Sequence, residues 1–257
     1  MNKDPFLGIL SLDTAFERIV GDVGNPQSYP FPVRVQVVDG ADSPKIVRAH
    51  APEQALADRF VAAAQALEAQ GAIAIISTCG FLVHLQDQVA RSVQIPVMLS
   101  ALSLFSMVRQ LHKGRIGILT ASEPALADKA LAAAGVERAQ IAVAGMEECS
   151  AFSQAFLRSR SGQSRVLDQQ SVEAYAVAQA QALQGQNPDL EAIILECGNL
   201  PPYADAIKQA TGLPVYDLQR GAVFLWEAAV ASSSPAQSLT QGMMAYGKAL
   251  NISRAQA

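Results

Sequence analysis

Short apolar runs alternate with amphipathic stretches along almost the whole chain. Apolar, β-branched runs predict strands at residues 6–10, 33–38, 73–78, 95–98, 115–120, 140–144, 193–196 and 215–217. Helical spacing of apolar residues predicts a helix at 53–70, where Leu56, Phe60 and Leu67 share one face. Strands and helices that alternate in this way indicate parallel sheets covered by helices on both faces, an α/β fold.

The same spacing predicts the remaining helices, and polar stretches predict the connections between them. Ser122 is expected to cap one of these helices and Gly135 to end it. The Ser/Arg/Gly-containing stretch 158–165 predicts an exposed connection. The predicted helices are 103–112, 122–134, 151–158, 171–183, 202–210, 221–231 and 237–250.

One local pattern occurs twice. Residues 74–80 read AIISTCG and residues 192–198 read AIILECG, so both apolar runs end at a Cys-Gly pair. A helix-like stretch and then a Pro-Val pair follow each, with 17 residues from cysteine to proline in both copies. The repeat therefore predicts one β-α-β unit used twice, with a thiol at the carboxyl end of a strand in each copy.

Ligands of open parallel sheets bind beyond the carboxyl ends of the strands, so Cys79 and Cys197 are expected to face one cleft. Each thiol precedes a predicted helix start, where free N–H groups and the helix dipole favour a thiolate and a lowered pKa. Gly80 and Gly198 would let the backbone approach a ligand. Two thiols that face each other across one carbon suit proton transfer on both of its faces.

Further candidate residues lie beside other strand ends. Asp13 follows the first strand. One interpretation is a site residue that tunes a thiol pKa or binds a hydrogen-bond donor of the substrate; the alternative is an exposed turn residue or helix cap. Thr120 and Ser122 either bind a carboxylate through their hydroxyls or cap the next helix. Cys149 has no counterpart in the repeat and is expected to be structural.

Composition and charge exclude several classes of protein. Half of the 257 residues are apolar, 16% are charged and the net charge is −4, which indicates a compact globular protein without a nucleic-acid footprint. No CxxC or His/Cys cluster signals a metal, and no Gly-rich phosphate loop signals a nucleotide cofactor. The N-terminus lacks a signal-peptide pattern, and no apolar run reaches the ~18 residues of a membrane helix. We therefore expect no cofactor, no membrane contact, a cytoplasmic location and reduced thiols, with a homo-oligomer left open.

On these motifs the chain resembles the aspartate/glutamate/hydantoin racemase superfamily, which includes cofactor-independent amino-acid racemases, hydantoin racemases, maleate isomerases and arylmalonate decarboxylases. The resemblance rests on residues 75–81, 115–122 and 194–200 and covers nearly the whole chain. It implies two similar α/β domains related by a pseudo-twofold axis, with the active site between them. Cys79 and Cys197 match the two cysteines that serve the family as acid and base. The implied domains are residues 1–98 plus 217–257 and residues 99–216.

The residues that follow each cysteine differ from those of the amino-acid racemases. Those enzymes usually carry Asn-Thr after the first cysteine and Thr after the second, where this chain has Gly80-Phe81 and Gly198-Asn199. Together with Thr78, these positions are the expected contacts of the substrate, with Phe81 as an apolar wall. We expect aspartate and glutamate to be poor substrates, because the polar pair is missing.

The sequence thus predicts a cofactor-independent racemase or isomerase that acts at a carbon α to a carboxylate or carbonyl. The predicted substrate is an amino acid, a hydantoin or a related small acid. Two alternatives stay open. One is a decarboxylase or cis–trans isomerase of the same superfamily that uses one cysteine. The other is a non-catalytic cytoplasmic protein that binds a small molecule, since two α/β lobes around a cleft also describe sensors.

Overall fold

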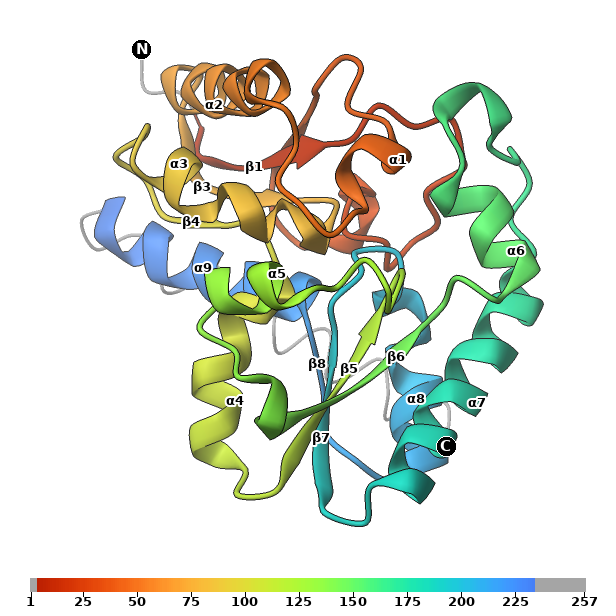
Figure 1. Cartoon of the computed structure of the whole chain (residues 1–257). Coiled ribbons are helices and arrows are strands. Elements are labelled where there is room, and N and C mark those ends of the chain that lie inside the picture. The colour runs from red at the N-terminus through yellow and green to blue at the C-terminus, as the bar shows by residue number, and fades with distance from the viewer. Residues whose placement is uncertain (1–3, 234–257) are drawn as a thin grey trace, which may run out of the picture.

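The computed structural model describes residues 4–233 of the chain. The helix predicted at 237–250, and with it the C-terminal end of the first predicted domain, lies outside the described residues. Within 4–233 the chain forms two four-stranded parallel sheets with flanking helices, so the predicted α/β fold is confirmed (Figure 1). Sheet one lies in the upper half of Figure 1 and sheet two in the lower half.

The strand orders of the two sheets are the same: β2-β1-β3-β4 in the first and β6-β5-β7-β8 in the second. The strands are β1 Phe6–Ser11, β2 Val33–Val37, β3 Ala72–Ser77, β4 Val97–Met98, β5 Arg115–Thr120, β6 Ile141–Gly145, β7 Leu190–Leu195 and β8 Val215–Asp217. The helices are α1 Ser43–Ile46, α2 Gln54–Ala69, α3 Gln86–Ala90, α4 Phe105–Leu111, α5 Asp128–Ala133, α6 Ser150–Phe152, α7 Gln169–Gln186, α8 Ala204–Thr211 and α9 Leu218–Ser233.

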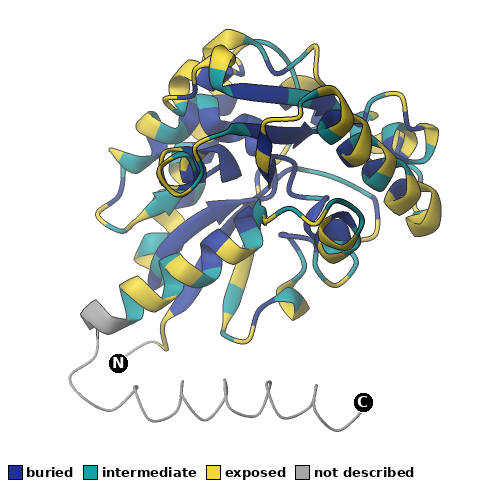
Figure 2. Cartoon of the chain, turned by 90° about the horizontal axis from the view of Figure 1, so that it is seen from below, coloured by how far each residue is buried: buried dark blue, intermediate teal, exposed yellow. Residues whose placement is uncertain are grey.

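The two central strands of each sheet make the core. Strands β1 and β3, and likewise β5 and β7, are buried over almost their whole length (Figure 2). Their uninterrupted apolar runs are typical of strands that are covered on both faces. Helix α2 contacts β1 and β3, and α7 contacts β5 and β6, which leaves the polar faces of the helices outward.

The internal repeat extends into details of the backbone. The β1–β3 pairing shifts register between Phe6 and Leu7, and the β5–β7 pairing shifts between Arg115 and Ile116. Gly8 and Gly117 lie two residues after the first residue of each shift, and at each of them an added Cβ would lie 2.9 Å from a leucine of the covering helix. The same contact demands the same small residue, so the two sheets are two copies of one packed unit.

The chain returns to the first sheet at its C-terminal end. Helix α9 follows β8 of the second sheet directly, but it packs against β3 of the first (Figure 1). The division into domains 1–98 plus 217–257 and 99–216 stays a prediction. None of the helices in the described part of the chain is long and apolar enough to span a membrane.

One local prediction was wrong and two others held only in part. The helix expected from Ser122 begins only at Asp128, because residues 123–126, which contain Pro124, form turns and a bend; its N-cap is Ala127. The connection 158–165 is largely exposed as predicted, apart from the buried Gln163 and the half-buried Ser164. After Cys79 a 3-10 stretch, Gly80–Leu85, precedes the α-helix, and after Cys197 a turn leads to α8, which lies close to the predicted 202–210.

Candidate active site

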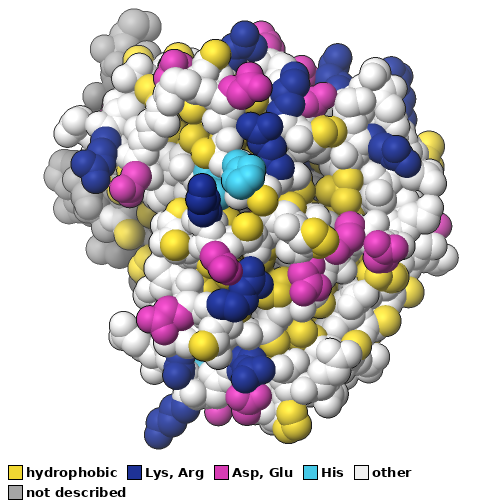
Figure 3. All heavy atoms as spheres, viewed as in Figure 1, with side chains coloured by type: hydrophobic (Ala, Val, Ile, Leu, Met, Phe, Trp, Pro, Cys, Tyr) yellow, Lys and Arg dark blue, Asp and Glu magenta, His cyan; other side chains and the backbone are white. Residues whose placement is uncertain are grey.

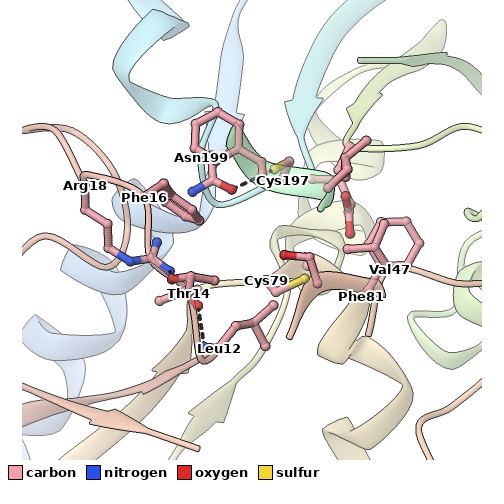
Figure 4. Close-up of a pocket in the computed structure, with 16 residues that line it drawn as sticks. Leu12, Thr14, Phe16, Arg18, Val47, Cys79, Phe81, Cys197 and Asn199 are labelled. Atoms are coloured by element: carbon pink, nitrogen blue, oxygen red, sulfur yellow. Dashed lines mark hydrogen bonds between the residues drawn. The ribbon is translucent and has the colours of Figure 1, made fainter. Parts of the chain in front are cut away.

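One pocket lies where the carboxyl ends of the two sheets meet, and both repeated cysteines line it (Figure 4). The pocket is narrow: the space between its lining residues, counted together with the open solvent at its mouth, is about 370 Å³. In Figure 4, Arg18 and Phe16 lie on one side of the two thiols and Phe81 and Val47 on the other. The lining residues are Leu12, Thr14, Phe16, Arg18, Ser43, Val47, Thr78, Cys79, Gly80, Phe81, Ala121, Phe156, Leu157, Glu196, Cys197 and Asn199.

Cys79 enters the pocket from the end of β3. The Ser77 hydroxyl fixes the turn, because it donates to the Leu99 carbonyl at 2.6 Å and accepts from the Cys79 N–H at 3.3 Å. The backbone N–H groups of Phe81 and Leu82, in the turn after Cys79, act to lower the pKa of its thiol. The turn therefore supplies two donors that favour a thiolate.

Cys197 enters from the end of β7 and meets a different set of groups. Its Sγ donates to Asn199 Oδ1 at 3.6 Å, which is a contact of a protonated thiol. Asn199 in turn donates through Nδ2 to Asp22 Oδ2 at 2.6 Å, and Arg18 Nη1 donates to Asp22 Oδ1 at 2.8 Å. The second thiol is thus held by a hydrogen-bond chain that reaches the first half of the molecule.

Each Cys-Gly glycine lies where the other half of the molecule comes closest. A methyl group at residue 80 would collide with the carbonyl oxygen and Oε1 of Glu196, and one at residue 198 would collide with the Thr78 carbonyl. The two glycines are needed because the two turns pass each other without room for a side chain. Gly198 also accepts from the Val23 N–H at 3.1 Å, which ties the turns together.

The residues before the cysteines occupy equivalent places but differ in chemistry. Thr78 Oγ1 accepts from the Leu12 N–H at 3.2 Å. Glu196 Oε2 accepts from the Thr120 hydroxyl at 2.9 Å, and the Ala121 backbone also favours the ionised carboxylate. Glu196 is 0% exposed, and its Oε1 has no hydrogen-bond partner within the described residues. A carboxyl group is therefore buried against the turn of Cys79 with one oxygen free.

The expected lowering of the thiol pKa values is wrong. Burial, followed by the Glu196 charge, raises the pKa of Cys79 to about 12. The same two causes raise the pKa of Cys197 well above its usual range. Burial also raises the pKa of the Glu196 carboxyl to about 7, against the Thr120 hydrogen bond. Desolvation raises the pKa of each thiol by more than the backbone donors lower it, because Cys79 and Cys197 are only 8% and 6% exposed.

Arg18 and three phenylalanines shape the rest of the pocket. Arg18 Nη2 donates to Thr14 Oγ1 at 3.2 Å, and its guanidinium lies 4.7 Å from the Phe16 ring centroid. The Phe16 and Phe156 rings meet edge to face at 4.7 Å. The pocket thus offers one cation and several apolar walls, which suits a small anion with an apolar or weakly polar body.

A segment from the second half closes the pocket against the first. Phe156 and Leu157 belong to a π-helix, Ser153–Leu157, that continues α6. Gln163 Oε1 then accepts from the Ala15 N–H at 2.7 Å, and its Nε2 donates to Ser43 Oγ at 3.4 Å. These contacts are why Gln163 is buried within an otherwise largely exposed connection.

The structure brings six of the ten predicted site residues to the pocket and leaves four outside its lining. Asp13 pairs with Arg160 at 2.8 Å and accepts from the Gly40 N–H, as a turn residue does. Thr120 holds a carboxylate, but that carboxylate is Glu196. Ser122 and Gly198 complete the four, and the six in the lining are Thr78, Cys79, Gly80, Phe81, Cys197 and Asn199.

Sequence reasoning missed several lining residues. Arg18, Phe16 and Thr14 lie in an irregular segment after β1 that carries no periodic signal. Glu196 did have a signal, because it is the acidic residue at the end of an otherwise apolar run. Cys149 is buried at the start of α6 and does not line the pocket.

The charged side chains on one face of the molecule and the possible metal ligands of residues 4–233 do not indicate a further site. On the face shown in Figure 3, basic and acidic side chains are interspersed without a large patch of either sign. Among the described residues, no group of three or more His, Cys, Asp or Glu side chains is arranged to hold a metal ion.

Comparison with known proteins gives a family. The model of the Asp/Glu/Hydantoin racemase family matches residues 25–224. Two similar sequences are a dimethylsulfoniopropionate lyase of Durusdinium sp. clade D and dimethylsulfoniopropionate lyase 7 of Emiliania huxleyi strain CCMP1516. Both are 30% identical to this chain, over 84% and 83% of its length. The chain spans 72% of the first relative and 64% of the second, which is less than two thirds of the latter.

Solved structures show the same fold at low identity. Unliganded arylmalonate decarboxylase superposes with a TM-score of 0.56 at 14% identity, covering 91% of this chain and 96% of that one. Allantoin racemase from Klebsiella pneumoniae gives a TM-score of 0.56 at 18% identity, covering 91% of each chain. These likenesses support the architecture of two similar lobes and carry no residue roles.

Proposed function

Since this chain belongs to the Asp/Glu/Hydantoin racemase family, whose members are enzymes, we propose that it removes a proton from the carbon α to a carboxylate with a pair of cysteines. Cys79 and Cys197 are the acid and base, and no cofactor takes part. The observation that carries the proposal is that both repeated thiols, from equivalent turns of the two halves, line one small pocket.

The surroundings of the two thiols assign their roles. Cys79 has two backbone donors at its sulfur and gains from the Arg18 charge. The Cys197 thiol donates a hydrogen bond to Asn199 Oδ1. Glu196 opposes the ionisation of both thiols, but Cys197 has only the Asn199 N–H in favour of its ionisation and has Cys79 and Asp22 against it as well. Cys79 is therefore the base that takes the α-proton, and Cys197 is the thiol that faces it across the substrate.

Arg18 is the group that supports binding of the substrate carboxylate. It is the cationic residue among those that line the pocket, and its guanidinium faces the ring of Phe16. Removal of the α-proton moves negative charge from the Cys79 thiolate to the substrate carboxylate, where the Arg18 guanidinium would stabilise it.

Two outcomes can follow removal of the α-proton: return of a proton to the other face, which racemises, or loss of a group from the β-carbon, which eliminates. Racemisation from either enantiomer needs two thiols that exchange roles. The unequal settings of Cys79 and Cys197 favour elimination. The 30% identity to lyases named for dimethylsulfoniopropionate, a carboxylate with a sulfonium leaving group, supports the same outcome.

Solvent exchange tests the proposal whichever of the two outcomes follows. The protein would be incubated in D₂O with dimethylsulfoniopropionate, other β-substituted propionates, amino acids, hydantoins, 2-hydroxy acids and arylmalonates. Proton NMR reports loss of the α-proton and release of the β-group, and chiral chromatography reports inversion. We expect elimination from a small β-substituted carboxylate and little action on aspartate or glutamate.

Each other outcome has a clear meaning. Inversion with deuterium at the α-carbon, starting from either enantiomer, would establish the racemase instead. Arylmalonate turnover that survives loss of one cysteine would point to a decarboxylase. Tight binding without exchange or turnover across the panel would contradict the enzyme proposal and favour a sensor.

A further inference from the structure

The buried carboxyl group of Glu196 is a feature that two-cysteine chemistry alone does not use. Its Oε2 accepts from the Thr120 hydroxyl, whereas Oε1 lies over Gly80, the residue after Cys79, without a hydrogen-bond partner among the described residues. A buried unpaired carboxyl oxygen costs stability, so its retention in the pocket calls for a use.

The position of Glu196 couples it to both thiols. Its charge is the second largest cause, after burial, that raises the pKa of Cys79 and of Cys197. Groups coupled in this way share protons: a charge on the carboxylate keeps the thiols neutral, and a proton on the carboxyl lets one thiol ionise. Thr78, the equivalent residue of the other half, cannot do this.

We propose that Glu196 is the proton acceptor that ionises Cys79, a relay residue that acts on the substrate through that thiol. The inference rests on the proposed role of Cys79 as base. The Glu196 carboxylate takes the thiol proton through one water molecule, since its Oε1 makes no direct hydrogen bond to the thiol, and leaves a thiolate that then takes the α-proton. The electrons of the Cα–H bond form the double bond as the leaving group departs with its bonding pair. Glu196 finally gives its proton to water.

The relay fits elimination better than racemisation. Elimination releases one proton per turnover, which must leave the pocket before Cys79 can act again. Racemisation returns a proton to the substrate and releases none. A carboxyl group with a pKa near 7 both accepts and releases a proton at neutral pH, which a buried thiol does not.

The test compares Glu196→Gln with Glu148→Gln, both in a Cys149→Ser background. Glu148 is an exposed glutamate that also precedes a buried cysteine, so it is a matched control. Alkylation of Cys79 by iodoacetamide is followed against pH by mass spectrometry, and turnover is followed against pH in parallel. Alkylation needs no substrate, so a failed proposed function and a failed relay give different results.

We expect opposite changes in the Glu196→Gln variant. Alkylation of Cys79 shifts to lower pH and becomes faster, because the neighbouring negative charge is gone. Turnover falls by about 10²-fold, and its rise near pH 7 disappears. Glu148→Gln matches the background in both assays. A structural role would instead slow both reactions or neither.

Three results would overturn the relay. They are unchanged turnover in Glu196→Gln, an unshifted alkylation profile, or a fall in both rates. If that variant does not fold, Thr120→Val replaces it. Loss of the Thr120 hydrogen bond removes an influence that lowers the pKa of Glu196, so the rise in turnover must move to higher pH. An unmoved rise would contradict the proposal equally.

Discussion

The two halves of the molecule share a strand order and a turn, but the residue before each cysteine differs: Thr78 in the first half and Glu196 in the second. The N–H of Thr78 bonds to the Leu10 carbonyl at 3.0 Å, and the N–H of Glu196 bonds to the Leu119 carbonyl at 2.8 Å. Beyond that point the first half presents a hydroxyl to the Leu12 N–H and the second presents a carboxyl group to Thr120. The repeat explains why two thiols meet, and the difference explains why they are unequal.

This asymmetry matters because a symmetric pair and an unequal pair do different chemistry. Equal thiols can exchange the roles of acid and base, as racemisation requires. Here two backbone donors and the Arg18 charge favour ionisation of Cys79 against Glu196. At Cys197 one backbone donor, the Asn199 N–H, acts against the charges of Glu196, Cys79 and Asp22. The two thiols occupy equivalent positions in the two halves but have unequal surroundings. Such a pair suits a reaction in which one thiol always takes the proton.

The largest expected effect separates the two cysteines. Cys79→Ser should lower kcat/KM by about 10³–10⁴-fold, because the base is lost, and Cys197→Ser should lower it by only about 10²-fold. Cys149→Ser, outside the pocket, should retain nearly full activity. Steady-state kinetics at neutral pH measures all three. Equal losses of kcat/KM in the Cys79→Ser and Cys197→Ser variants would contradict the unequal roles and support a symmetric pair of thiols.

The next effect is on stability against pH. The folded pKa of Glu196, about 7, lies above its ordinary value of 4.5, so the folded state holds the proton longer than the unfolded state. Stability from this group is full below pH 4.5 and falls by about 3 kcal/mol as pH rises to about 7. Urea unfolding at both ends of this window should show the loss in the wild type and not in Glu196→Gln. Thr78→Val, in the other half, should keep the wild-type pH dependence.

A smaller effect is expected at the two close approaches. Gly80→Ala and Gly198→Ala each force a methyl group against the opposite half, at a cost of about 1–3 kcal/mol in the free energy of unfolding. Gly185→Ala in α7 is the control: no atom lies within 4 Å of its added Cβ, so it should gain about 0.5–1 kcal/mol. A neutral Gly80→Ala, measured by urea unfolding, would mean that Glu196 does not occupy the space over the Cys79 turn.

The smallest effect is expected where Gln163 of the second half bonds to the first half beside the pocket. Gln163→Ala removes the bond to the Ala15 N–H, worth about 0.5–1.5 kcal/mol, and should raise KM by roughly two- to tenfold with little change in kcat. Gln154→Ala, exposed in the same segment, should change neither. A loss of kcat without a change in KM would show that the segment does more than cover the substrate.

Much of this molecule could be predicted from its sequence, because strands buried on both faces leave uninterrupted apolar runs and a repeat shows itself in spacing. The α/β fold and the family were confirmed, and the Cys79/Cys197 pair was found by alignment of the chain with itself. The residues after β1 and the π-helix were not found, since irregular segments follow no period. Ser122 failed as a helix cap, because turns that include Pro124 follow it.

Glu196 is a site residue that the sequence patterns did not identify, although the internal repeat contains a signal for it. Glu196 stands where Thr78 stands in the other copy, and a repeat makes such a difference meaningful. Its burial, its unpaired oxygen and its influence on both thiols depend on the contact between the halves, which no single-strand pattern contains. Comparison of the two copies position by position, and not only at the cysteines, would have indicated it.

Exchange of the α-proton by single-cysteine variants tests the inequality of the two thiols most directly. With the substrate that the panel identifies, Cys197→Ser in D₂O should still exchange the α-proton, or replace one of two α-protons stereospecifically, because Cys79 and Glu196 remain. Cys79→Ser should show no exchange above the uncatalysed rate. Exchange by Cys79→Ser that equals or exceeds exchange by Cys197→Ser would contradict the assignment of Cys79 as the base.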